Sequence, residues 1–113
     1  MSNKNNASLP GSSDLYVINE QAKRYTLRDN GFTETKNGTF IYERSLGTTV
    51  MDKKAPKLKV TVSKDFSELK LSSVSANGLK KIDLYKGSQF EKERELAEHI
   101  LKTFVEENVL DKA

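Results

Sequence analysis

Apolar and polar residues alternate most regularly between residues 57 and 72 of the chain. The apolar positions there are Leu58, Val60, Val62, Leu69 and Leu71. A period of two is typical of strands that bury one face and expose the other, so the pattern predicts two strands joined by a turn at Asp65-Phe66-Ser67. Val74 falls on the opposite parity from the leucines, which predicts a bulge or a strand end near Ser73.

Helices are predicted on both sides of these strands. Thr26 can cap a short helix with Asp29 three residues later, and Gly31 suits the left-handed residue that ends it. A long helix is predicted over residues 89–108, where apolar residues recur at helical spacing. Its apolar stripe consists of Phe90, Ala97, Ile100, Leu101, Phe104 and Val105. Asn108 suits a left-handed cap, after which the chain folds back.

A hairpin is predicted between the short helix and the alternating strands, with its own strands near residues 31–35 and 39–46. The Asn37-Gly38 pair suits a two-residue type I′ turn, which would pair Thr35 with Phe40. One face of this hairpin would carry Thr33, Thr35, Phe40, Tyr42 and Arg44, and the other Phe32, Glu34, Ile41 and Glu43. Aromatic and charged residues on both faces predict that both are at least partly covered.

Three alternatives for the second covered face stay open. It could meet a second sheet or the core, a second copy of the chain, or a ligand. A ligand pocket would use Tyr42, Glu43 and Arg44 as its polar groups. Self-association into a homodimer would place Phe40 and Tyr42 at the centre of the interface, because buried aromatics there carry most of the binding energy.

The remaining segments complete a predicted single domain over residues 15–113. Residues 1–14 are polar and rich in Ser and Asn, so a mobile leader is expected there, with structure beginning at a strand over Leu15 to Ile18. Asn77-Gly78 suits a second turn before a strand over residues 79–85. The expected fold class is α+β, with antiparallel strands in two small sheets packed on one long C-terminal helix.

Charge is distributed unevenly along the 113 residues. The total is +3, but residues 89–113 carry seven acids and four bases, a net −3, which leaves +6 for residues 1–88. The basic part could attract an anion, a phosphate-bearing ligand or an acidic protein face, or could be an ordinary solvated surface. Outward parity on successive predicted strands is shared by Lys57, Lys59, Lys70 and Lys81.

Several classes of function are disfavoured or excluded. Nucleic acid is disfavoured, because the long helix is acidic and Tyr85 is the one aromatic residue that shares the outward parity of the lysines. Lysines on outer strand faces also discourage edge pairing. The chain has no cysteine and a single histidine, His99, expected to be exposed, so no metal, cofactor or catalytic residue is assigned. No apolar run is long enough for a membrane span or a secretory signal, which predicts a cytoplasmic protein.

The run from Tyr25 to Leu46, with Leu58 to Val62 and Ser75 to Leu79, resembles a small family of uncharacterised Gram-positive bacterial proteins assigned to amino-acid metabolism. The resemblance covers roughly residues 15–110. It implies an α+β fold of two sheets against one principal helix, with a remote likeness to the pyruvoyl-dependent S-adenosylmethionine decarboxylases and an association with sulfur amino acids. Those enzymes cleave a Glu-Ser bond to form their pyruvoyl group, and this chain has no Glu-Ser dipeptide. We therefore expect the decarboxylase chemistry to be absent.

The resulting hypothesis is a non-catalytic accessory module that binds a small metabolite or a metabolic enzyme. The residues assigned to its ligand site are Phe40, Tyr42, Glu43, Arg44, Asn77 and Lys80. One alternative is a homodimeric interaction protein. The other is an enzyme with an inconspicuous carboxylate and lysine, such as Glu43 with Lys80.

Overall fold

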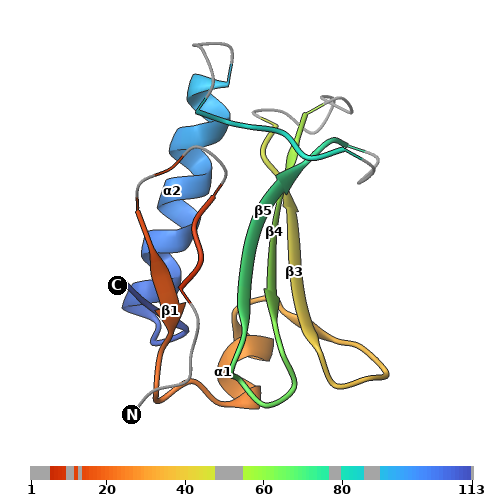
Figure 1. The fold of residues 1–113 in the computed structure, drawn as a ribbon, viewed down its shortest axis with the longest axis vertical. Coiled ribbons are helices and arrows are strands. Elements are labelled where there is room, and N and C mark those ends of the chain that lie inside the picture. The colour runs from red at the N-terminus through yellow and green to blue at the C-terminus, as the bar shows by residue number, and fades with distance from the viewer. Residues whose placement is uncertain are drawn as a thin grey trace.

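Two antiparallel sheets and one long helix form the fold (Figure 1). The computed structural model describes residues 6–9, 12, 14–47, 55–76, 80–85 and 90–112. Its elements are β1 (Tyr16–Ile18), α1 (Arg24–Asp29), β2 (Thr33–Glu34), β3 (Phe40–Ser45), β4 (Lys57–Val62), β5 (Leu69–Val74), α2 (Glu91–Glu106) and β6 (Leu110–Lys112). The predicted α+β class, with a small sheet pair and a C-terminal helix, is confirmed.

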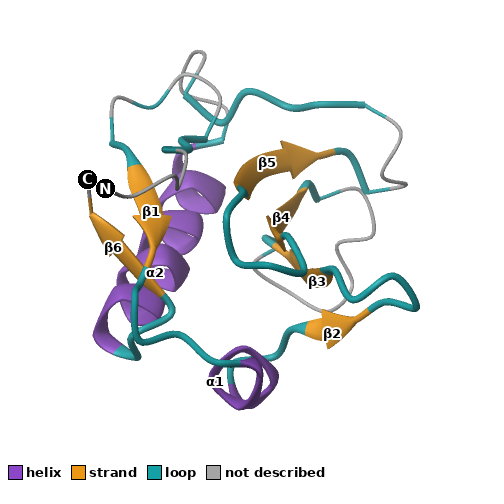
Figure 2. Cartoon of the chain, turned by 60° about the horizontal axis from the view of Figure 1, so that its bottom comes forward, coloured by secondary structure: helices purple, strands orange, loops and turns teal. Residues whose placement is uncertain are grey.

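The larger sheet has the order β2-β3-β4-β5, and α2 lies on one side of it together with the β1–β6 ribbon (Figure 2). The predicted alternation is confirmed in β4 and β5, whose inward residues Leu58, Val60, Val62, Leu69 and Leu71 are buried. These side chains belong to one core with the predicted helix stripe, of which Ala97, Ile100, Leu101 and Phe104 are buried. The opposite face of the sheet, called the outer face below, carries the lysines.

Strand β5 ends at Val74, as the predicted strand end near Ser73 required, and it keeps an unbroken register with β4 up to that residue, without a bulge. Ser73 is fully buried on the inward side, and its hydroxyl donates a hydrogen bond to the carbonyl of Ile82. A polar residue can occupy this inward position because it has that partner. The expected strand over residues 79–85 is not formed in the described residues 80–85, where Lys81 makes a single bridge to Val74. The turn predicted at Asn77-Gly78 lies outside the described residues.

The hairpin loop consists of residues 36–38, closed by a hydrogen bond from the Thr35 N–H to the Thr39 carbonyl at 2.8 Å, so the predicted two-residue turn was wrong. Gly38 has a φ of +87°, but Asn37 is not in the left-handed region, whereas a type I′ turn needs positive φ at both positions. The Gly38 N–H donates to the Thr35 carbonyl at 3.0 Å, and the register then pairs Glu34 with Phe40 and Thr33 with Ile41. A shift of one residue moves every β2 side chain to the other face, so Glu34 and not Thr33 lies on the side of Phe40.

The second face of the hairpin is not covered as expected. On β3, the outward residues Glu43 and Ser45 are exposed, while Ile41 is half-buried. Within the described residues no second sheet packs against this face, because the β1–β6 ribbon lies on the same side as α2. On the inward side of β3, Phe40 is buried.

The two ends of the chain are joined in the β1–β6 ribbon. Asn108 takes the predicted left-handed conformation with a φ of +62°, and the Val109 N–H donates to the Phe104 carbonyl at 2.8 Å. This helix ending turns the chain back so that β6 pairs with β1. Ordered contacts begin earlier than the predicted start at Leu15, because Leu9 in the expected leader is buried in the core.

Helix α1 begins earlier than predicted. Its N-cap residue is Lys23, and Thr26 lies three positions later, where its Oγ1 accepts a hydrogen bond from the Lys23 N–H at 3.2 Å. Thr26 was therefore wrongly predicted as the cap itself. The predicted exit is confirmed: Gly31 has a φ of +93°, and its N–H donates to the Arg28 carbonyl at 3.1 Å.

Candidate functional site

Of the six residues assigned to a ligand site, the structure describes five, and these five do not come together in one pocket. Tyr42 and Arg44 share one pocket, Lys80 lines a hollow on the outer face, and Glu43 is exposed on that face without lining the hollow. Phe40 is buried in the chain's own core, so it is not free to form the centre of a dimer interface. Asn77 lies outside the described residues. Glu43 does not line the hollow of Lys80, and the pairing of these two residues as catalytic groups stays a prediction.

The pocket of Tyr42 and Arg44 lies where β3, α2 and the end of α1 meet. It has a volume of about 230 Å³. Its lining residues are Asn30, Tyr42, Arg44, His99, Ile100, Thr103 and Phe104. None of them is acidic, and three carry groups that can bind an anion: the Arg44 guanidinium, the His99 imidazole and the Tyr42 hydroxyl. This set is called the arginine–histidine pocket below.

Alternation along β3 places the two strand residues of this pocket. Tyr42 and Arg44 are inward residues, paired across the ladder with Val60 and Leu58. Tyr42 is half-buried under α2, whereas Arg44, two residues further on, is exposed at the edge of the core. The phenol therefore forms an inner wall, and the guanidinium lies at the entrance.

The helices supply the polar groups on the other sides. His99 and Thr103 are four residues apart and so lie on one edge of α2, where the Thr103 hydroxyl donates to the His99 carbonyl at 3.0 Å. Asn30 ends α1, and its side-chain amide donates to the Thr26 carbonyl at 2.8 Å. Among the described residues, the structure gives no hydrogen-bond partner to the Tyr42 hydroxyl, the Arg44 guanidinium or the His99 imidazole.

An aromatic cluster forms the floor of the pocket. The rings of Tyr42 and Phe104 meet edge to face at 87°, with centroids 5.0 Å apart, and Phe32 lies 5.5 Å from Tyr42. Such pairs add stability beyond the area they bury. The position of the Tyr42 hydroxyl therefore depends on the packing of α2 on β3.

Gly31 also determines where the Tyr42 ring lies. A Cβ at this position would be 3.2 Å from Cε2 of Tyr42, and the φ of +93° is one that other residues rarely adopt. We expect Gly31→Ala to lower the free energy of unfolding by about 1–2 kcal/mol, the usual cost of a left-handed residue with a Cβ. Urea denaturation measures this loss. Gly31→Asn tolerates the backbone conformation better and should cost less; an equal loss in both variants would assign the cost to the contact with Tyr42.

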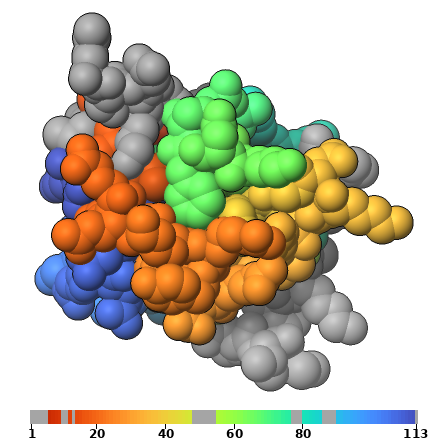
Figure 3. All heavy atoms as spheres, turned by 90° about the horizontal axis from the view of Figure 1, so that it is seen from below, coloured from red at the N-terminus to blue at the C-terminus, as the bar shows by residue number. Residues whose placement is uncertain are grey.

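A second hollow lies at the hairpin end of the molecule, where α1, the hairpin loop and the β4–β5 turn meet (Figure 3). It has a volume of about 350 Å³, and Arg24, Glu34, Lys36 and Lys64 contribute its charges. Hydrogen bonds from Arg24 and then from Arg28 hold the pKa of Glu34 below its usual range. Both ion pairs are exposed, and they connect α1 to β2. We interpret this hollow as a structural junction.

Comparison with known proteins identifies the family. The profile of DUF1831, described as "Putative amino acid metabolism", matches residues 1–111. The chain belongs to the DUF1831 family. The fold is similar to the crystal structure of a DUF1831 family protein from Lactobacillus plantarum, determined at 1.20 Å resolution. That match has 31% sequence identity and a TM-score of 0.87, and it covers 100% of this chain and 99% of the other. No curated protein sequence matches the chain.

The family assignment confirms part of the resemblance proposed from the sequence. Membership and the amino-acid metabolism label are borne out, while the likeness to S-adenosylmethionine decarboxylases stays a prediction. In the part of the chain that the structure describes, no cluster of three metal-binding side chains occurs. Within the same residues, no helix is long and apolar enough to cross a membrane.

Sequence reasoning identified two of the five polar residues that line the arginine–histidine pocket. Tyr42 and Arg44 were assigned to a ligand site, and His99 was correctly predicted to be exposed. The proximity of His99 to Arg44 was missed, because it depends on how α2 crosses β3. At 100° per residue His99 lies well away from the centre of the apolar stripe, so the periodicity gives no signal for its place in the pocket.

Proposed function

We propose that this DUF1831 chain is a non-catalytic accessory module that binds a small carboxylate-bearing metabolite, of the amino-acid class, in the arginine–histidine pocket. The observation that carries the proposal is the convergence of Arg44, His99 and the Tyr42 hydroxyl, with no acidic side chain in the lining. The family's assignment to amino-acid metabolism supports this class of ligand. In this role the chain would act in the cytoplasm, beside the enzymes of that metabolism.

The chemistry of the lining matches a carboxylate. A guanidinium can donate two parallel hydrogen bonds to the two oxygens of a carboxylate, and such charged bonds are stronger than neutral ones. The Tyr42 hydroxyl and the imidazole N–H of His99 can donate further bonds, and the aromatic floor offers apolar contact. Arg44 would thus select the carboxylate, and the floor would accept an aliphatic or thioether side chain.

The size of the pocket restricts the ligand. A volume of about 230 Å³ lies below the roughly 300–1,000 Å³ of sites for drug-sized ligands. A free amino acid or a similar small acid is therefore preferred over a dinucleotide or a peptide. Sulfur amino acids are included among the candidates because the sequence resemblance points to them.

The role is proposed as binding without chemistry because the lining lacks the usual combinations for catalysis. General acid and base work commonly pairs two titratable groups, and a nucleophile needs an adjacent base. Thr103 donates its hydrogen bond to the backbone carbonyl of His99 and not to the imidazole. Among the described lining residues, His99 therefore has no nucleophile that it activates.

The test is a ligand panel on the whole chain. Thermal unfolding is recorded with the amino acids, S-adenosylmethionine and nucleotides, since a ligand at 100 times its Kd adds about 2.7 kcal/mol. Titration calorimetry then compares the best ligand on the parent chain, Arg44→Gln and Arg28→Gln. We expect Arg44→Gln to weaken binding at least about tenfold, as loss of a charged hydrogen bond does.

Arg28→Gln is the matched control, because it removes the same charge from an exposed arginine that does not line the pocket. It should leave the affinity unchanged. A flat response to the panel, or equal weakening in both variants, would contradict a carboxylate site at Arg44.

A further inference from the structure

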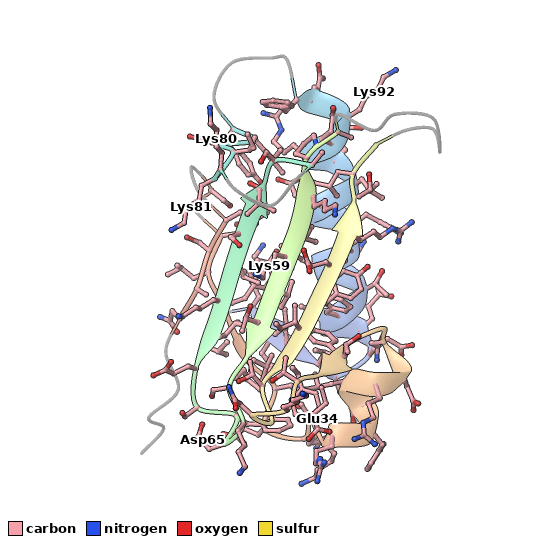
Figure 4. All side chains as sticks on the ribbon, turned by 90° about the vertical axis from the view of Figure 1, so that its right-hand side faces the viewer. Glu34, Lys59, Asp65, Lys80, Lys81 and Lys92 are labelled. Atoms are coloured by element: carbon pink, nitrogen blue, oxygen red, sulfur yellow. The ribbon has the colours of Figure 1, made fainter. Side chains whose placement is uncertain are left out.

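Lysines from three segments line a hollow that reaches from the outer face of the large sheet to its β5 edge, where Ala7, Ser8, Leu69 and Leu71 also line it. The hollow has a volume of about 680 Å³. Lys59 of β4 extends from the middle of this face, and Lys80 and Lys81 lie beside the end of β5 (Figure 4). Lys70 of β5 completes the basic lining. We call these four lysines and the space between them the lysine hollow.

The surface between the lysines is suited to a ligand. Thr61 and Ser72 contribute hydroxyls, and Ile41 and Val74 contribute apolar surface. None of the residues that line the hollow is acidic. Glu43 is the cross-strand partner of Lys59, so one carboxylate lies near the rim, against four ammonium groups. The local charge of the hollow therefore stays positive.

Protection against edge pairing does not explain this arrangement. Lys70 lies on β5, an edge strand, where a lysine prevents another chain from pairing. Lys59 lies on β4, which is hydrogen-bonded on both sides and has no free edge. Lys80 and Lys81 arrive from the segment after β5, held there by the bridge between Val74 and Lys81. The fold thus places four like charges around one hollow.

We infer that the lysine hollow binds a small molecule that carries a chain of two or more phosphate groups. Lysine is a common phosphate ligand and acts as a point charge, so several separate lysines suit a ligand with several separate charges. Hydroxyls of the Thr61 and Ser72 type donate to the same oxygens. A volume of about 680 Å³ is within the range of small-molecule sites. This inference does not depend on the arginine–histidine pocket.

A small molecule fits better than a nucleic acid. Recognition of single strands adds aromatic side chains on which bases stack. Tyr85 was the aromatic predicted to share the outward parity of the lysines, but its hydroxyl bonds Glu98 of α2, and Arg94 lies 5.4 Å from its ring centre. Tyr85 is therefore turned toward the helix. Among the described residues lining the hollow there is no aromatic side chain.

The experiment is titration calorimetry of the whole chain with inorganic pyrophosphate and tripolyphosphate at constant ionic strength. The double variant Lys59→Gln/Lys81→Gln removes two charges from the hollow. Lys92→Gln/Lys102→Gln removes two charges from exposed lysines of α2 and is the matched control. We expect binding that weakens with added salt, at least about tenfold loss in the hollow variant, and an unchanged affinity in the control and in Arg44→Gln.

Three outcomes would overturn the inference. The first is the absence of binding by either phosphate compound. The second is an equal loss in the hollow variant and in the control, which would mean a response to net charge alone. The third is tighter binding of a single-stranded RNA oligonucleotide or an acidic peptide, with the same dependence on Lys59 and Lys81, which would assign the hollow to a macromolecule. Circular dichroism of both variants verifies that they are folded.

Discussion

Replacing Phe104 by alanine is expected to lower the free energy of unfolding by about 3–5 kcal/mol, the usual cost of removing a buried phenyl ring. Phe104 is 3% exposed. Its ring lies 5.0 Å from that of Tyr42 and 5.4 Å from that of Phe32, so the variant loses two aromatic pairs as well as buried area. A domain of this size is stable by only about 5–15 kcal/mol, so the loss is a large share of the total.

His99→Ala on the same helix is the control for this prediction. The His99 side chain is exposed and makes no hydrogen bond among the described residues, so its replacement should change stability by less than about 0.5 kcal/mol. Chemical denaturation of both variants measures the contrast. Equal losses would mean that the buried face of α2 has been placed wrongly. His99→Ala should still impair ligand binding in the arginine–histidine pocket, which separates the two roles of the helix.

Elements whose pattern is local were predicted well. The long helix was expected over residues 89–108 and occupies Glu91–Glu106. The alternation at Leu58, Val60 and Val62 correctly predicted which residues of β4 point inward. Both signals depend on neighbours within a few residues. The left-handed exits at Gly31 and Asn108 were recognised for the same reason, because the residue type and its position after a helix suffice.

Features for which the local sequence allows two arrangements of similar energy were not predicted. Asn37-Gly38 is compatible with a two-residue or a three-residue hairpin loop, and one residue of difference reverses the faces of β2. The inward position of Ser73 was not predicted either, because it is explained only by the hydrogen bond to the distant carbonyl of Ile82. The sequence shows the hydroxyl that donates, but only the fold brings the accepting carbonyl next to it.

In the candidate sites, too, the features that depend on nearby residues were predicted, and those that depend on distant residues were not. The parity of Lys59 and Lys70 was read from the strands, and the assignment of Tyr42 and Arg44 came from the hairpin. The lysine hollow depends on the bridge between Lys81 and Val74, which brings the segment after β5 to the sheet. The arginine–histidine pocket depends on the position of His99 of α2 beside β3. Residue types can thus be proposed from sequence, while their grouping into sites needs the tertiary structure.

Leu110→Ala is expected to lower the free energy of unfolding by about 2–5 kcal/mol. Leu110 is fully buried, and its partner across the ribbon, Ile18, is 1% exposed. The residue follows directly on the turn that ends α2, where the Val109 N–H bonds the Phe104 carbonyl. Truncation would therefore leave a cavity where β1, β6 and α2 meet, and would loosen the attachment of the first strand to the helix.

Lys112→Ala on the same strand is the matched control. Lys112 is exposed, and its Nζ lies 3.5 Å from a carboxylate oxygen of Asp14 in a solvent-accessible ion pair. Such pairs contribute about 0–1 kcal/mol, so this variant should unfold almost like the parent chain. Urea denaturation of the two variants distinguishes packing from charge at the ribbon. If Leu110→Ala proved as mild as Lys112→Ala, the ribbon would contribute little to stability, and the core would end at the last turn of α2.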